Sequence, residues 1–277
     1  MKAYISCDLD GVCGVVDREQ LFDAASADYR HACRLLTAEV NAAVEGALEA
    51  GATEVVVNDG HYHMRNLVVD ELHPRARAIV GRFKPGFMVE GLDSTFGVAL
   101  FVGYHAAVGV ADGTLNHTYH ALELRLNDLL CSEGTINAAV AGHYGVPVGL
   151  VTGDVATIDT LREQLGPQLR GVAVKRGITR LAAHHLMSVQ EARDAIRSEA
   201  ARAVRSAIEG SAPSPLKLDT PIQMRLAFKE TLYADVSALL PGAERLDGRT
   251  LQWTCSDIIE AYRLFVVTYY LSRGVDG

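Results

Sequence analysis

Two carboxylates stand one residue apart near the start of the chain, in the stretch CDLDGVCG at positions 7–14. They come directly after an apolar run, so Asp8 and Asp10 are placed at the end of a predicted strand over residues 4–7. Because side chains alternate along extended backbone, both carboxylates face the same way. The pattern indicates a cation site, either of a phosphoryl-transfer enzyme with Asp8 as nucleophile or of a metallohydrolase with both residues as ligands.

Other metal-capable side chains follow further predicted strands. In an open parallel sheet, ligands bind at the carboxyl ends of the strands, so these side chains are expected at one edge. Asp59 and His61 follow the second strand, His105 the third and Asp154 the fourth, while Glu133 starts a predicted helix and can reach the same crevice. Such a mixture of carboxylates and imidazoles suits zinc, with manganese as the second choice.

Each of these residues also has a purely structural interpretation. An aspartate at a strand end is more often a turn former or a helix N-cap than a ligand. Isolated loop histidines such as His61 are usually solvated, His105 could be a hydrogen-bonded core histidine, and Glu133 could simply favour its helix N-terminus. What favours a metal site is the convergence of several candidates on one sheet edge.

The elements that must position these residues alternate between strand and helix. Short, nearly continuous apolar runs separated by helices are typical of a parallel sheet covered on both faces, so we predict an α/β fold with three α/β/α layers. A Gly/Ser/Pro-rich stretch at 210–221 predicts a boundary between an α/β domain (1–210) and a smaller α+β C-terminal domain (211–277). The predicted strands cover 4–7, 53–59, 98–106 and 146–154, the helices 28–50, 132–143 and 188–209, and a hairpin 120–131.

The composition is that of an ordinary globular protein. The chain has 277 residues, of which 49% are hydrophobic and 22% charged, with a net charge of −8 and no Lys/Arg block, which argues against nucleic acid as a partner. There is no apolar stretch of the ~20 residues that a membrane span needs, and charge appears too early for a signal peptide. We therefore expect a soluble cytoplasmic protein whose five scattered cysteines are reduced.

The segment ISCDLDGV resembles the first motif of the haloacid dehalogenase phosphatases, which are magnesium enzymes. The segment GDVATID, from Gly153 to Asp159, has the spacing of that family's acidic motif. However, the family needs a lysine shortly before that motif, and residues 113–153 contain none. It also has no use for histidines at the strand ends, so this alternative is the weaker one. A non-catalytic peptide-binding accessory of a transporter is disfavoured by the lack of an export signal.

A longer series of segments is similar to the D-aminopeptidases of the dipeptide-transport operon type, a family of dizinc metallopeptidases. The matching segments occur in family order over residues 1 to about 180, and DIIEAYRLF extends the match into the last predicted helix. They include YISCDLDGVCG, GATEVVVNDGHYHMRNL, LHPRARAIVGRFKP, ALFVGYHA, GTLNHTYH, SEGTINAAVAGHYGVPVGLVTGD and AVKRGITR. The resemblance implies two Zn²⁺ per subunit, hydrolysis of the N-terminal residue (a D-amino acid such as D-Ala) from short peptides by a metal-bridged hydroxide, and a homodecamer of two stacked pentameric rings.

The resemblance also implies roles for individual residues. Asp8 would bridge the two zinc ions, Asp10 and His61 would complete one ion's ligands, and His105 and Glu133 the other's. His117, in LNHTYH, falls where the family has a catalytic histidine. The family has Glu where this chain has Asp10. Because metal–ligand distances tolerate only about ±0.2 Å, the shorter side chain implies either a shift of the backbone or a more weakly held ion that Mn²⁺ can replace.

Overall fold

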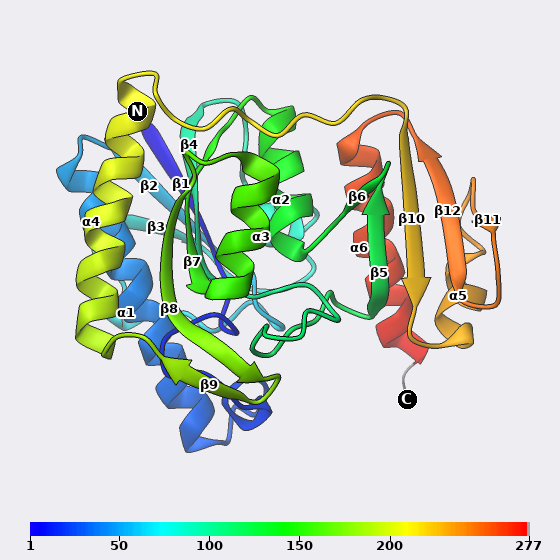
Figure 1. Cartoon of the computed structure of the whole chain (residues 1–277), viewed down its shortest axis with the longest axis horizontal. Helices are drawn as coiled ribbons and strands as arrows, with labels where there is room; N and C mark the ends of the chain where they lie inside the picture. The colour runs from blue at the N-terminus through cyan, green and yellow to red at the C-terminus, as the bar shows by residue number, and fades with distance from the viewer. Residues whose placement is uncertain (276–277) are drawn as a thin grey trace.

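The structure is a computed structural model and describes residues 1–275. Its larger sheet has seven strands in the order β3-β2-β1-β4-β7-β8-β9, and all neighbours are parallel except β8 and β9 (Figure 1). The strands are β1 (Lys2–Cys7), β2 (Glu54–Asp59), β3 (Ala76–Ile79), β4 (Phe96–Tyr104), β7 (Val148–Asp154), β8 (Arg170–Thr179) and β9 (Ala182–His185).

Helices cover both faces of this sheet, which confirms the predicted α/β class with its three layers (Figure 1). One apolar core lies between the sheet and the pair α1 (Ala27–Glu49) and α4 (Val189–Ile208). The opposite face is packed against α2 (Glu133–His143) and α3 (Val155–Leu165), the latter not anticipated from the sequence.

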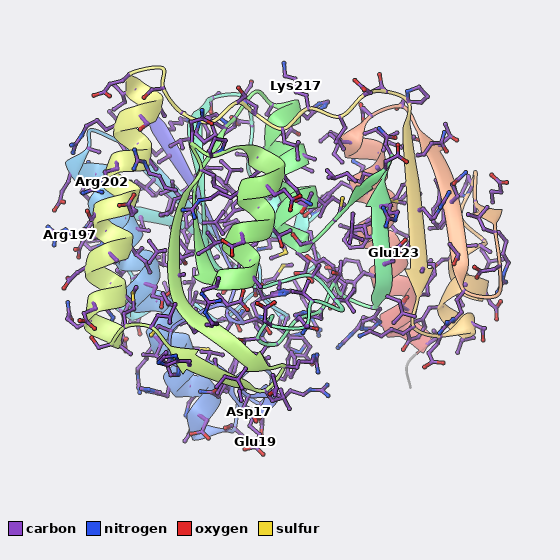
Figure 2. All side chains as sticks on the ribbon, in the orientation of Figure 1. Asp17, Glu19, Glu123, Arg197, Arg202 and Lys217 are labelled. Carbon is purple, nitrogen blue, oxygen red and sulfur yellow. The ribbon has the colours of Figure 1, made fainter. Side chains whose placement is uncertain are left out.

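The helices α1 and α4 are amphipathic, and their polar faces are exposed to solvent. Arg197 and Arg202 project from the exposed face of α4, as Figure 2 shows, and Arg197 forms ion pairs with Glu45 and Glu49 of α1. Each helix begins where the sequence predicts, because Ser26 and Ser188 accept hydrogen bonds from the free N–H groups of the first turn.

A second, antiparallel sheet lies beyond α2 and has the strand order β11-β12-β10-β5-β6 (Figure 1). The predicted hairpin within 120–131 is confirmed, but it belongs to this sheet, where Leu124 pairs with Leu226. The sheet that dominates the C-terminal segment thus includes strands from both sides of residue 210, and the division at that residue stays a prediction. The elements are β5 (Ala121–Leu126), β6 (Leu129–Leu130), β10 (Ile222–Phe228), α5 (Thr231–Ser237), β11 (Glu244–Arg245), β12 (Thr250–Cys255) and α6 (Ile258–Val275).

The remaining sequence expectations concern the cysteines and the membrane. All five cysteines are buried and free, as expected for packing residues. Within the described residues, the helices are too short or too polar to cross a bilayer. The connecting loops contain the short 3₁₀ helices η1 (Arg18–Gln20), η2 (Val69–Glu71) and η3 (Phe87–Val89).

Candidate metal centre

The strand order reverses at β1, which has β2 on one side and β4 on the other. Ligands of open α/β sheets bind at such a switch point, outside the carboxyl ends of the strands. Asp8 follows β1, His61 follows β2 and His105 follows β4. The topology therefore brings together three of the residues that the sequence singles out.

The first potential ligand group consists of Asp8, Asp10 and His61. His61 Nδ1 lies 3.0 Å from Asp8 Oδ1 and 2.9 Å from Asp10 Oδ2. All three residues are at least 96% buried. One ligand atom from each lies within 4.8 Å of the others, which is compact enough to coordinate a single metal ion. The Asp10 side chain thus reaches the group despite being shorter than the Glu of the family pattern.

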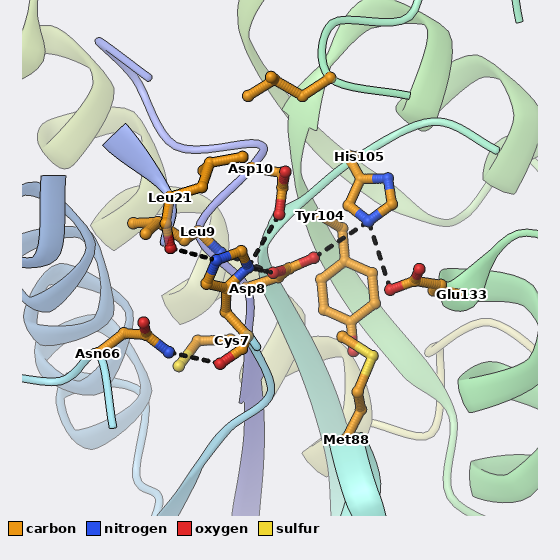
Figure 3. Close-up of polar contacts among 12 residues, drawn as sticks. Cys7, Asp8, Leu9, Asp10, Leu21, Asn66, Met88, Tyr104, His105 and Glu133 are labelled. Carbon is orange, nitrogen blue, oxygen red and sulfur yellow. Dashed lines mark hydrogen bonds and ion pairs between the residues drawn. The ribbon is translucent and has the colours of Figure 1, made fainter. Parts of the chain in front are cut away.

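The second group shares Asp8 with the first. His105 Nε2 lies 3.3 Å from Asp8 Oδ2 and 3.3 Å from Glu133 Oε2. Glu133 is the first residue of α2, whose position is fixed by a capping box at Ser132. Figure 3 shows Asp8 between Asp10 on one side and His105 with Glu133 on the other. The two oxygens of Asp8 therefore face different groups, the geometry of a bridging carboxylate.

The histidines are held in tautomers that leave one ring nitrogen available. His61 Nε2 lies 3.0 Å from the carbonyl oxygen of Leu21, and His105 Nδ1 lies 2.9 Å from that of the next residue. His117 Nδ1 lies 2.8 Å from the carbonyl oxygen two residues earlier. Because a carbonyl only accepts, each of these nitrogens must carry the proton. The opposite nitrogens face the centre, as in metal sites whose histidines are oriented by a second hydrogen bond.

Several buried atoms of the centre have no hydrogen-bond donor or acceptor. They are Asp8 Oδ2, both carboxylate oxygens of Asp10 and His105 Nε2. Buried charged oxygens without a partner are costly, and a cation bound between them removes that cost. Three carboxylates with two imidazoles are also a donor set that zinc accepts. The residues present therefore fit the metal that the sequence implies.

The charges of the centre depend on one another. Burial raises the pKa of Asp8, and the charge of Asp10 adds to the effect. Burial alone would raise the pKa of Asp10, but His61 outweighs it and lowers that pKa. Burial alone would lower the pKa of His105, but Glu133 outweighs it and raises the pKa to about 10. In the metal-free chain, imidazolium protons thus balance the carboxylates, and a bound cation would replace these protons.

His117 lies beside the two ligand groups and is less buried than their members. Its ring stacks on His105 with centroids 4.0 Å apart and an interplanar angle of 7°. Its Nε2 lies 3.7 Å from Glu133 Oε1, and 26% of its side chain is exposed. Burial lowers its pKa, and the neighbouring His105 lowers it further. His117 is therefore neutral at pH 7, and its Nε2 is free to take up a proton.

Two glycines allow the ends of β1 and β4 to meet at backbone distance. The N–H of Gly11 donates to the Gly103 carbonyl at 2.8 Å, and the N–H of Asp8 donates to that of Val102 at 2.8 Å. A Cβ on Gly11 would lie 1.9 Å from the main-chain carbonyl oxygen of Tyr104, and Gly103 has a φ of +73° that favours glycine. We call residues 8–15, which follow β1 and carry both aspartates, the aspartate loop. These contacts fix the aspartate loop relative to His105.

A buried lysine holds the aspartate loop from the other side. Lys175 of β8 is fully buried, and its Nζ donates to the carbonyl oxygens of Asp10, Val12 and Val15 at 2.7, 3.1 and 2.5 Å. Burial lowers its pKa to about 8, so it is still mostly protonated at pH 7. Sequence reasoning missed this residue, although a lone lysine directly after the apolar segment GVAV was a usable signal.

Two of the candidate aspartates have structural roles instead. Asp59 Oδ2 accepts from the N–H groups of Asn66 and Leu67, and it closes the loop that carries His61. Asp154 Oδ1 caps α3 by accepting from the Thr157 N–H, while its Oδ2 accepts from the Thr114 N–H. Neither belongs to a ligand group, so their interpretation as a turn former and an N-cap is the right one.

The phosphatase alternative is not supported by this arrangement. In GDVATID, Asp154 caps a helix and Asp159 is exposed on that helix. Lys175 donates to backbone carbonyls, whereas a phosphatase lysine would hold the nucleophilic carboxylate. The imidazoles beside Asp8 are also foreign to that chemistry.

A cavity of about 340 Å³ opens above the ligand groups. Asp8, Asp10 and Glu133 line it from the buried side, and His117 lies in its wall. The volume is in the range of small-molecule sites. Much of the remaining wall is aromatic and consists of Phe22, Tyr62, Phe87, Tyr119 and Tyr269.

Comparison with known proteins gives a consistent result over the whole chain. A family model described as D-aminopeptidase matches residues 1–267. A D-aminopeptidase of Bacillus subtilis is 36% identical over 270 residues, which is 96% of each chain. A solved structure, described as the Zn-dependent D-aminopeptidase DppA from Bacillus subtilis, a self-compartmentalizing protease, superposes with a TM-score of 0.93 at 34% identity and full coverage of both chains. The chain therefore belongs to the D-aminopeptidase family of peptidases.

Proposed function

We propose that this protein is a zinc-dependent aminopeptidase that removes the N-terminal residue, a D-amino acid such as D-Ala, from short peptides. Two Zn²⁺ ions per subunit would be held by the ligand groups described above. The observation that carries this proposal is the position of Asp8, whose two oxygens face separate sets of ligand atoms. The preference for D-residues is supported by family membership and by the names of the relatives.

Bound zinc would lower the pKa of a coordinated water to about 7 and polarise the scissile carbonyl. The chain's own residues then handle protons and orientation. His117 is neutral, with its Nδ1 proton committed to the Leu115 carbonyl, so its Nε2 can hold the proton that the attacking water loses. The same nitrogen can deliver that proton to the leaving amine. Two nearby dications would keep the pKa of His117 low, which favours this use as a base first and an acid second.

This centre has Asp10 where the family pattern has a glutamate. Its oxygen is already 2.9 Å from the His61 nitrogen, so the shorter side chain reaches the ligand group. Carboxylate-rich ligand sets also accept manganese, and we propose Mn²⁺ as the alternative metal at the Asp10 side of the centre.

For the assembly we propose a homodecamer of two stacked five-membered rings in the cytoplasm. The proposal is supported by the solved relative, which is described as self-compartmentalizing. Tyr262 and Phe265 are buried in the protein's own core, and Tyr269 lines the cavity.

The test of the proposed function is metal reconstitution combined with a peptide assay. Chelator-treated protein is expected to be inactive on D-Ala-D-Ala, and zinc should restore turnover together with a content of two ions per chain. L-Ala-L-Ala serves as the stereochemical control. Full turnover by the metal-free protein would refute the proposal, and equal turnover of both peptides would refute its stereochemical part.

A further inference from the structure

Cations gather at the open side of the cavity above the metal centre. The chain as a whole carries a net charge of −8, so the positive charge at the cavity has the opposite sign to that of the protein. The acidic residues in the cavity wall are the buried ones of the ligand groups, whereas the basic residues are exposed at its mouth. These basic residues are Arg18, Arg180, Lys229 and Arg273.

Arg180 is fixed to the segment that carries the catalytic histidine. Its carbonyl oxygen accepts from the Leu115 N–H at 2.7 Å, and its Nε donates to the Asn116 carbonyl at 3.1 Å. His117 in turn donates to the Leu115 carbonyl. The guanidinium group therefore has a defined place beside His117, at the edge of the space where a substrate would react.

Lys229 is fixed to the other end of the same loop. Its main-chain N–H donates to the His120 carbonyl at 3.2 Å, and its Nζ lies 3.4 Å from the Tyr119 carbonyl oxygen. The Tyr119 N–H donates to Glu133 Oε1 at 2.9 Å. Two cations are thus tied to a loop that also contacts the second ligand group.

Acidic side chains near the mouth lie outside the cavity. Asp17 and Glu19 flank Arg18 in the sequence, but neither contributes to the cavity wall, and Figure 2 shows both at the outer edge of the molecule. Among the described residues, the exposed charges that line the cavity are therefore all positive. Basic side chains at the mouth of a cavity favour an anionic group there.

We propose that this mouth is a carboxylate subsite, with Arg180 as its principal residue and Lys229 as its second cation. It would bind the C-terminal carboxylate of a short peptide whose N-terminal residue lies at the metal centre, so the inference rests on the proposed function. The planar guanidinium fork suits a carboxylate, which it can bind through two parallel hydrogen bonds. In a longer peptide, uncharged backbone would lie at the mouth, and the enzyme would thereby select short peptides with a free carboxyl end.

The experiment compares D-Ala-D-Ala with its C-terminal amide on the zinc-loaded protein by kcat/KM or, if the peptides are not hydrolysed, by the Kd from calorimetry. Both peptides present the same scissile bond and differ in the terminal charge. The wild type is expected to favour the acid by roughly 10- to 100-fold, the size expected for a charge-assisted hydrogen bond. Arg180→Gln should remove most of this preference by weakening the acid alone, and Arg180→Lys should recover part of it.

A matched control is Arg176→Gln, which removes the same charge from an exposed position of β8 outside the cavity wall and should leave the preference intact. Equal kcat/KM for acid and amide in the wild type would overturn the subsite. So would an Arg180→Gln variant that loses activity on both peptides equally, since that result indicates displacement of His117. If neither peptide is hydrolysed, the proposed function fails, and the ratio of the two Kd values decides the subsite separately: equal values refute it.

Discussion

Replacing Lys175 by methionine tests how the aspartate loop is held. The substitution keeps an unbranched side chain that is one atom shorter but removes three hydrogen bonds to the backbone of that loop. Hydrogen bonds to a charged group contribute about 1.5–3 kcal/mol each, and the lower cost of burying a neutral side chain offsets part of the loss of three, so we expect a net cost of about 3–5 kcal/mol. In a chain of this size, such a loss lowers Tm by roughly 6–20 °C.

The more specific expectation concerns zinc. The main-chain carbonyl of Asp10 accepts a hydrogen bond from Lys175, and its side chain carries a proposed ligand oxygen, so release of the loop is expected to displace that oxygen. Loss of the groups that orient metal ligands typically weakens affinity by about 10- to 100-fold. We therefore expect Lys175→Met to bind zinc 10- to 100-fold more weakly, measured by competition with a chelator of known affinity at a temperature where the variant is folded.

Leu226→Ala is the matched control for stability. Leu226 is 2% exposed in the second sheet, and its truncation costs about 2–5 kcal/mol without touching the aspartate loop. This variant should lose a similar amount of stability while retaining the zinc affinity of the wild type. If Lys175→Met also retains that affinity, the lysine contributes only to stability, and our account of how the loop is positioned is wrong.

The other predictions concern residues closer to the metals. Glu133→Ala should bind about one zinc ion fewer per chain by elemental analysis; an unchanged content would exclude it as a ligand. Asp10→Glu should retain both ions with equal or tighter affinity in the chelator competition, and loss of zinc would contradict our interpretation of the shorter side chain. Because burial and His105 lower the pKa of His117, its base form is lost only as the pH falls below 6.5. The coordinated water would itself titrate near pH 7, so His117 should add a second acid limb to kcat below pH 6.5 in wild type. That second limb should be absent from the residual activity of His117→Gln, which keeps its zinc; identical acid limbs in the two proteins would argue against the assigned role. Gly11→Ala places a Cβ 1.9 Å from a backbone oxygen and should lower both Tm and zinc content, and wild-type values for both would show that the two strand ends can separate without consequence.

The sequence predicts the sheet edge well because its signals are local. Four strands are visible as apolar runs, and each ends in a polar residue at the carboxyl edge. What the sequence does not predict depends on contacts between distant segments. Lys175 meets the loop of Asp10 across 165 positions, and Gly11 is required by the path of β4 rather than by its own neighbours. Asp59 and Asp154 resemble ligands in the sequence. Only the tertiary structure shows that they bind backbone N–H groups instead.

The second sheet determines when the centre can be completed during synthesis. The chain leaves the first sheet at His105, forms β5 and β6, and returns at Glu133, while Leu126 pairs with Met224. This partner strand emerges roughly a hundred residues later, which at about 5–20 residues per second means a delay of roughly 5–20 s. During that interval Asp8, Asp10 and His61 are already on the nascent chain, but β5, which lies between His117 and Glu133 in the sequence, still lacks its partner β10. The side of the centre that contains His117 and Glu133 is therefore expected to reach its final geometry only after β10 has been synthesised.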